Sequence, residues 1–201
     1  MSAATTPEDE TAEAIFGLRH MALRNALYHT ARYRFLDGVN RWFNFMVILG
    51  GTGTAAEIAK SNPAAATFLG GGIAAIGALQ LVFDYAGRAH RHEGLQRRYY
   101  EMLADIDCSA RPDEDDCARW RADVSRIAAD EPPTMRALDA IADNQATSAL
   151  LGGDRPRMRV TGWQSITRQL LAHNGGKFDI DPHWKSAEEL AADREKARGG
   201  E

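Results

Sequence analysis

A glycine-rich segment, Phe45–Ala56, is the part of this sequence that most resembles a chemical motif. It reads FMVILGGTGTAA, an apolar run followed by the spacing G-x-G-x-x-A. In dinucleotide-binding folds such glycines let the backbone and a helix N-terminus approach a pyrophosphate. The motif also requires an acidic residue about 20 positions further on, and residues 61–83 contain none. We therefore predict no cofactor, and we keep a soluble nucleotide-binding protein that uses residues 50–56 as a second alternative function.

Other residue types that could carry chemistry lack the spacing that catalysis or metal binding needs. His90 and His92 lie two positions apart, and Cys108 and Cys117 lie nine apart, which matches no usual zinc site. The chain contains neither a G-x-S-x-G sequence nor a Gly-Lys-Ser/Thr phosphate loop. We predict a protein that is not an enzyme, with no catalytic and no metal-binding residues. The net charge of −4 gives no whole-chain argument for nucleic acid, and we predict no nucleic-acid partner.

Five polar residues of two largely apolar runs are candidates for a role inside a membrane, where lipid would restrict the direction in which their side chains point. They are Asn44, Thr52, Thr54, Glu57 and Gln80. Inside a membrane such side chains avoid lipid and face partner helices or water. Two interpretations remain open. In an oligomer these residues could line a pore; otherwise the threonines bond their own backbone and Gln80 joins the two helices.

A basic cluster later in the chain is the other candidate contact. Arg155, Arg157 and Arg159 alternate with uncharged residues. Closely spaced arginines can bind phosphate or the headgroups of anionic lipids. The alternative is an ordinary charged surface loop.

The elements that must position these residues are two apolar runs. Ser61–Phe83 has 23 residues and no Asp, Glu, Lys or Arg, which is long enough to cross a bilayer. The run before it, Trp42–Ala59, has 18 residues with Glu57 as its only charge, at the short limit for a span. Asn62-Pro63 is a turn signal between them. We predict a two-helix transmembrane hairpin with spans at about 42–59 and 63–83.

Small residues recur every four positions along the second run. They are Ala66, Gly70, Ala74 and Ala78. Such a stripe lets helix backbones approach closely inside membranes, where glycine is tolerated better than in water-soluble helices. We predict these four residues as a helix-packing surface.

The flanking charges predict the orientation of the hairpin. Residues 17–42 contain five arginines and one acid, and residues 84–100 contain four arginines and two acids, whereas the tip carries only Lys60 as a base. By the positive-inside rule both termini of the hairpin lie in the cytoplasm. The mean hydropathy of −0.39 suggests a soluble protein, but it averages this apolar region with a charged remainder.

The fold class predicted for the whole chain is all-α, because no repeated alternation of period two indicates a sheet. Long amphipathic cytoplasmic helices are expected before and after the hairpin. We expect a disordered tail at 1–14, a helix, the hairpin and the following helix at 15–107, a cytoplasmic helical region at 108–175, and a polar tail with a short helix at 176–201.

Three helices are expected in the cytoplasmic region. An acid-rich start at Asp113–Asp116 begins the first, because acidic side chains favour helix N-termini. Pro132-Pro133 ends that helix and opens the second. Apolar spacing from Trp163 to Leu171 predicts a short third helix.

The order of these parts resembles a known family. An arginine-rich helix with the sequence HTARYRFLD (29–37) precedes two short spans, and HEGLQRRY (92–99) and AADEPPTMRALD (128–139) follow them. Over about residues 15–150 this arrangement resembles the SLATT family, two-transmembrane effectors associated with SMODS and SLOG domains in bacterial conflict systems. The resemblance implies an effector that oligomerises and forms pores when a nucleotide-signalling partner is triggered. It transfers no functional residue to this chain.

The leading functional hypothesis is therefore a small protein of the bacterial inner membrane that forms pores or disrupts the membrane in a bacterial nucleotide-linked defence system. Its expected partners are membrane lipid, further copies of itself and a nucleotide-signalling protein encoded nearby. The first alternative is a non-enzymatic scaffold or assembly subunit that the hairpin anchors to the membrane.

Overall fold

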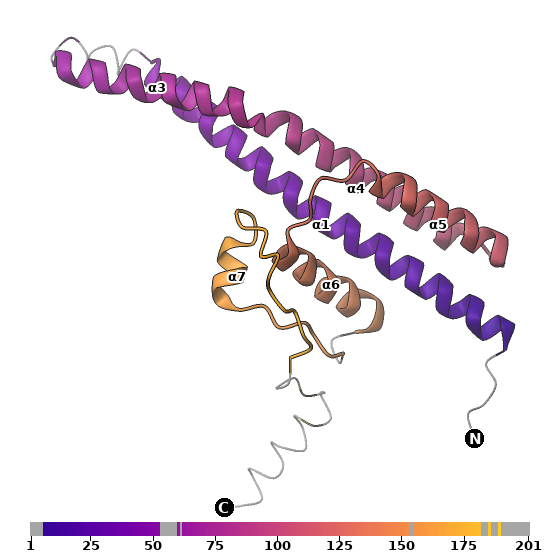
Figure 1. Cartoon of the computed structure of the whole chain (residues 1–201). Coiled ribbons are helices and arrows are strands. Elements are labelled where there is room, and N and C mark those ends of the chain that lie inside the picture. Colours follow the sequence, from indigo (N-terminus) through magenta and orange to yellow (C-terminus); the bar gives the residue numbers. More distant parts are fainter. Residues whose placement is uncertain are drawn as a thin grey trace, which may run out of the picture. The chain divides into compact units, whose positions relative to one another are not determined.

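The computed structural model describes residues 6–52, 60, 62–152, 155–181, 185 and 189, and in these ranges the chain is all-α, as predicted (Figure 1). The helices are α1 (Pro7–Gly50), α3 (Pro63–Phe83), α4 (Tyr85–Cys108), α5 (Glu114–Ala128), α6 (Arg136–Leu151) and α7 (Gly162–Thr167). Within the described ranges the β structure consists of one isolated antiparallel bridge between Met158 and Ile180.

The chain divides into two compact units that do not follow the expected boundaries. One unit, called unit 1 below, comprises residues 1–29 and 95–201, and unit 2 comprises residues 30–94. Helices α1 and α4 each contribute to both units. The sequence-based division placed residues 15–107 in one region. The observed division differs from it because the first part of α1 and the last part of α4 pack with the later helices.

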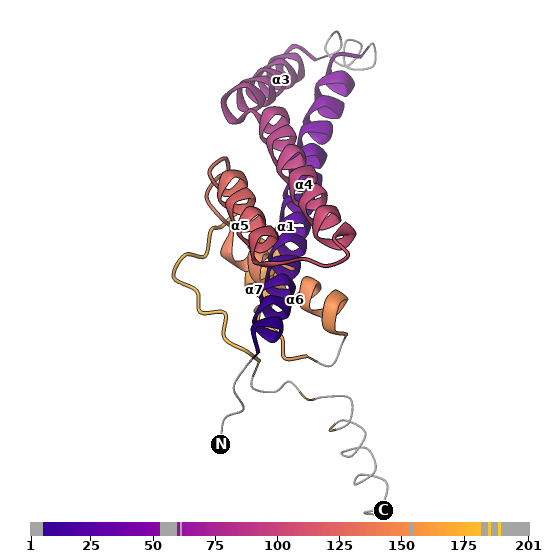
Figure 2. The ribbon, with the colours of Figure 1, turned by 90° about the vertical axis from the view of Figure 1, so that its right-hand side faces the viewer.

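The core of unit 1 is formed where α1, α4 and α5 lie side by side (Figure 2). Its largest member is Trp120 of α5, which is only 2% exposed. Each helix contributes apolar residues at three- and four-residue steps, the spacing that places them on one helix face. The buried members are Leu18, Ala22, Ala26, Leu95, Tyr99, Met102, Ile106, Cys117, Trp120 and Ile127.

Helix α1 begins earlier than expected. Residues 7–14, assigned to a disordered tail, are helical. Thr6 and Asp9 cap this start reciprocally: the Asp9 N–H donates to Thr6 Oγ1, and the Thr6 N–H donates to Asp9 Oδ2. Proline at the first helical position suits the helix because it has no N–H to satisfy there.

The later helices confirm one expected boundary and shift another. Asp113 and Asp116 form a capping box at the start of α5, as the acidic run predicts. Helix α6 begins at Arg136, not at Pro132-Pro133. A residue that precedes proline is disfavoured in the α region, and the Met135 N–H is bound by Tyr28 Oη at 2.9 Å. Residues 131–135 are therefore non-helical.

The third expected helix is shorter than predicted, since α7 ends at Thr167. Residues 168–170 continue as a turn, in which the N–H groups of Leu170 and Leu171 both donate to the Thr167 carbonyl. In the expected polar tail, residues 176–181 are non-helical. Most of 182–201, where the short tail helix was expected, lies outside the described residues.

In unit 2, α3 coincides with the second predicted apolar segment, and Asn62 caps it by accepting hydrogen bonds from the N–H groups of Ala64 and Ala65. The part of α1 from residue 30 to residue 50 runs antiparallel to α3 (Figure 1). Near the end of α1 the helices approach closely, since a Cβ at Gly50 would lie 2.6 Å from Ile73 Cδ1. At its other end α3 gives way to α4 at Asp84, which has a left-handed φ of 42°.

Among the described residues one helical stretch, Ala64–Cys108, contains a window long and apolar enough to cross a membrane. That window has a mean hydropathy of 1.8, and none of it is buried within the chain. The other expected span, 42–59, is described only as far as Thr52, because residues 53–59 lie outside the described residues. The first nine residues of this expected span, Trp42–Gly50, are uncharged and form the end of helix α1.

A tryptophan pair tests the position of the core. Trp120→Ala should lower the free energy of unfolding of unit 1 by about 3–5 kcal/mol, because it empties a packed site. Trp163→Ala, at an exposed position, should change it by less than about 0.5 kcal/mol. Chemical unfolding of the detergent-solubilised chain, followed by circular dichroism, measures both values. Equal losses would contradict the assigned core.

Candidate functional site

Helix α3 and the end of α1 from Trp42 to Gly50, which carry no charged residue, expose large apolar side chains. On α1 these include Trp42 and Ile48, and on α3 they include Leu81 and Phe68, which is 82% exposed. Leaving this much apolar surface in water is unfavourable by about 25 cal/mol per Å². Contiguous exposed patches of this kind are typical of membrane or protein contact surfaces. An apolar groove of about 670 Å³ between α1 and α3 belongs to the same region.

The predicted small-residue stripe does not form the contact between α3 and α1. Ala66 is partly buried, but Gly70, Ala74 and Ala78 are exposed. A Cβ at Gly70 would meet nothing within 4 Å. The side of α3 that faces α1 carries Ile73 and Gln80 instead. The stripe is therefore open to a second molecule, and its role in packing stays a prediction.

Two of the five polar candidates bond each other across the helix pair. The Gln80 side-chain amide donates to Asn44 Oδ1 at 2.9 Å, which joins α3 to α1. The Thr52 hydroxyl donates to the carbonyl of Leu49, in its own helix, at 2.7 Å. Thr54 and Glu57 lie outside the described residues. The prediction that these five residues line a pore stays a prediction. The alternative, in which Gln80 joins the two helices, is supported by its hydrogen bond to Asn44.

The glycine-rich segment lacks the strand that its nucleotide-binding interpretation needs. Residues 45–50 are the last turns of helix α1, and Gly51 and Thr52 form the turn that follows. A dinucleotide fingerprint requires a strand before its first glycine. Because residues 45–50 are helical, the interpretation of this segment as a dinucleotide-binding motif is corrected. The later glycine of the motif, Gly53, lies outside the described residues.

Unit 1 contains a polar cluster that the sequence patterns did not single out. His29 is 1% exposed, and its ring stacks on Tyr99 with centroids 5.8 Å apart. His29 Nε2 lies 3.2 Å from Glu131 Oε1, and the Tyr99 hydroxyl donates to the same oxygen at 2.6 Å. The three residues come from α1, α4 and the 131–135 segment. Their contacts hold that non-helical segment against two helices.

Burial and hydrogen bonding shift two pKa values in this cluster in opposite directions. Burial raises the pKa of Glu131, but the hydrogen bonds from His29 and Tyr99 outweigh it, so the pKa of this carboxyl is below its usual range. Burial, together with the bond to the Glu131 carboxylate, raises the pKa of Tyr99 well above its usual range. At neutral pH the cluster therefore holds a carboxylate and a neutral phenol.

A second polar row joins α1 to α6. Arg24 Nε lies 3.3 Å from Asp139 Oδ1, and Arg24 also lies 3.9 Å from Asp143. His20 Nε2 lies 3.0 Å from Thr147 Oγ1. Burial raises the pKa of Asp139 even though Arg24 opposes the shift. No group of three His, Cys, Asp or Glu side chains in the described ranges is placed to hold a metal ion.

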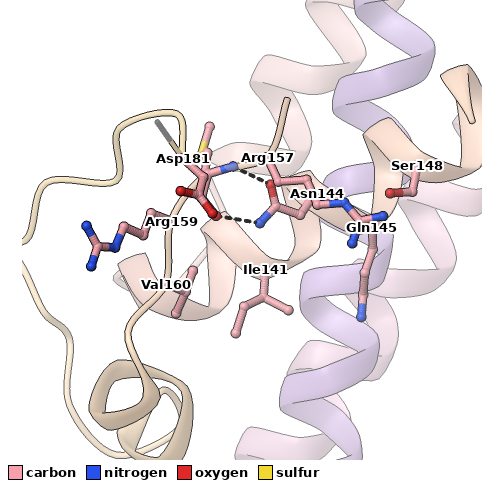
Figure 3. Close-up of a pocket in the computed structure, with 9 residues that line it drawn as sticks. Ile141, Asn144, Gln145, Ser148, Arg157, Arg159, Val160 and Asp181 are labelled. Atoms are coloured by element: carbon pink, nitrogen blue, oxygen red, sulfur yellow. Dashed lines mark hydrogen bonds between the residues drawn. The ribbon is translucent and has the colours of Figure 1, made fainter. Parts of the chain in front are cut away.

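The basic segment, residues 155–159, is held on α6 by the side-chain amide of Asn144. Asn144 accepts from the Met158 N–H at 2.7 Å and donates to the Met158 carbonyl at 2.9 Å (Figure 3). The Asp181 N–H donates to the Arg157 carbonyl at 2.8 Å. Arg157 and Arg159 line a cavity of about 500 Å³ beside α6, together with polar side chains of that helix. Arg155 is exposed and does not line it.

No family model, no curated protein and no solved structure matches this chain. The resemblance to the SLATT family therefore stands on the order of elements and the quoted segments alone. The functional inferences below depend on the surfaces and contacts of the chain itself.

Acid unfolding should depend on Glu131. Because the pKa of Glu131 is lower in the folded chain, its hydrogen bonds stabilise the fold fully above the ordinary glutamate pKa of 4.5. This stabilisation is lost as the pH falls through the lower folded pKa. Glu131→Gln should reduce the free energy of unfolding by about 2 kcal/mol at neutral pH, and the remaining stability should fall less steeply in acid. Unfolding curves over a pH series measure both effects.

The control for this measurement is Glu101→Gln, which changes an exposed carboxyl on α4. Exposed ion pairs contribute little, so this variant should keep the native acid slope and lose less than about 1 kcal/mol. An unchanged acid slope in Glu131→Gln would contradict the coupling described above.

Proposed function

We propose that this chain is a small integral membrane protein whose region 42–83 forms a two-span helical hairpin, self-associates and permeabilises the bacterial inner membrane. The observation that carries the proposal is the surface of α3 and of the end of α1, which is apolar, free of charge and uncovered by the rest of unit 2. A membrane supplies the apolar surroundings that the chain itself does not.

The ends of the helix pair support a placement across the bilayer. Phe43 of α1 and Tyr85 of α4 contact each other with ring centroids 5.5 Å apart, and Trp42 packs on Phe45. Such aromatic clusters suit the membrane–water interface. Arginines precede Trp42 in the sequence and follow Tyr85, and this excess of positive charge at the aromatic end of the helix pair favours cytoplasmic termini.

The open small-residue stripe supports self-association through α3. Because Gly70 and Ala74 are not used against α1, a second copy could approach the backbone there. Two spans per chain cannot enclose water, so a pore requires several copies. We propose that the trigger is a nucleotide-signalling protein encoded nearby, as the SLATT resemblance implies. A nucleotidyltransferase gene beside this one would support that assignment.

A membrane-anchored scaffold is the alternative function. The Gln80–Asn44 bond and the Thr52–Leu49 bond favour it, because these polar groups are already satisfied within one chain. In an anchor they need no water-filled lumen. The two functions share the hairpin and differ in whether the membrane loses its potential.

Membrane insertion is tested by an arginine at the centre of α3. Ala75 is exposed there, and Ala75→Arg adds about 2.5–3.5 kcal/mol to the free energy of insertion, which should lower the equilibrium constant for insertion about 100-fold. Carbonate extraction of membranes measures the resulting loss of inserted chain. The matched control is Ala104→Arg on an exposed face of α4 in unit 1, which should insert like the native chain. A native chain found in the soluble fraction would refute the membrane placement.

Pore formation is tested by filling the stripe. Gly70→Leu with Ala74→Leu should abolish both cross-linked oligomers and depolarisation in overproducing bacterial cells, measured with a voltage-sensitive dye. Neither position touches α1, so the helix pair should persist. The control, Gly71→Leu with Ala75→Leu, makes the same changes one position along and should keep both activities. Inserted native protein that leaves the potential intact would favour the scaffold instead.

A further inference from the structure

Helix α7 presents its apolar side outward. Trp163, Ile166 and Leu170 are spaced three and four residues apart, which places them on one side of the helix and its following turn. They are 66%, 78% and 70% exposed. On the opposite side, Ser165 and Arg168 are partly buried. This is the reverse of the usual amphipathic arrangement, in which the apolar side faces the core.

Hydrogen bonds hold α7 in this orientation. Thr161 and Gln164 form a reciprocal capping box at its start. The Thr167 hydroxyl lies 2.7 Å from the carbonyl of Trp163 and 2.8 Å from His173 Nε2. Beyond the turn, the Arg136 N–H of α6 donates to the Ala172 carbonyl at 3.1 Å. The outward apolar side is therefore a fixed surface that unit 1 leaves uncovered.

The segment around this surface carries a positive charge that contrasts with the rest of the chain. Residues 155–181 contain five bases and two acids, a net charge of +3, whereas the whole chain has −4. Arg157 and Arg159 are fixed in place through the backbone contacts of the basic segment with Asn144 and Asp181. Tryptophan and aliphatic side chains beside arginines are the composition of helices that lie in a membrane interface.

We propose that α7 and the basic segment 155–159 form a second membrane contact, which binds the surface of a bilayer that contains anionic lipid. Trp163, Ile166 and Leu170 enter the interfacial layer, and the arginines face the lipid phosphates. The excess of positive charge selects an anionic lipid surface over a neutral one. The inference deepens the membrane proposal and rests on it, because the hairpin would hold the chain at the bilayer.

The experiment uses the full chain in lipid nanodiscs. The emission of the native chain minus that of Trp163→Phe isolates Trp163 from the other tryptophans. In discs of brominated phosphatidylglycerol mixed with phosphatidylcholine, most of this difference emission should be quenched, and it should lie at shorter wavelength than in detergent. In discs with brominated phosphatidylcholine alone the quenching should be weak, and high salt should reduce the quenching in the anionic discs.

Paired variants assign the effect to each part of the surface. Ile166→Asn with Leu170→Asn, and separately Arg157→Gln with Arg159→Gln, should each relieve most of the quenching. The matched controls are Phe16→Asn on α1 and Arg121→Gln on α5, both at exposed positions of unit 1, and they should leave it unchanged.

Several outcomes would overturn the inference. Equal quenching in neutral and anionic discs would refute the anionic selectivity. A short-wavelength Trp163 emission in detergent that no lipid quenches would show that protein covers this side, either a second copy or another segment. Chain incorporated in the discs without any Trp163 quenching refutes this inference alone, whereas a chain that does not enter the discs refutes the hairpin proposal with it.

Discussion

The dominant physical constraint on this protein is an apolar helix that the chain does not cover. Helix α3 has no charged residue over its 21 positions, and among the described residues of unit 2 it packs along one side on the end of α1. Its remaining sides expose residues such as Phe68, Leu81 and Val82. The described helices of unit 2 leave these side chains uncovered, so their burial requires a bilayer or a partner.

The constraint also explains the contrast between the two units. Unit 1 buries Trp120 and Tyr99 among three helices and uses polar contacts, such as that of His29 with Glu131, to fix a non-helical segment. Those groups are satisfied within the unit, which is the normal requirement of a water-soluble core. In the described part of unit 2, α1 and α3 are joined by the bond from Gln80 to Asn44 and by close apolar contact, as between Gly50 and Ile73.

The proposed function gives the chain two ways to respond to a partner. The proposed hairpin would change its association within the bilayer, and the helices of unit 1 would change how they meet the bilayer surface. The outward apolar side of α7 and the arginines beside it belong to the second way, while the open stripe of Gly70 and Ala74 belongs to the first. Both surfaces are unused in the single chain.

Much of the helical fold could be predicted from local patterns. The bounds of α3 and the acidic start of α5 follow from hydropathy and capping, which depend on neighbouring residues only. The start of α1 at Pro7 and of α6 at Arg136 were missed. The first depends on a two-residue cap at Thr6, and the second on Tyr28, which binds a backbone group 107 residues away.

The sequence by itself therefore determined the all-α class, the charge-free run Ser61–Phe83 and the concentration of arginines at one end of the predicted hairpin, because these are properties of short stretches of chain. Only the tertiary structure decided which side of α3 faces α1, where the small-residue stripe points and why α7 shows its apolar side outward. The association of His29, Tyr99 and Glu131 was also decided there, across separations of 102 and 32 residues. Such pairings depend on how helices pack in space, which no local periodicity records.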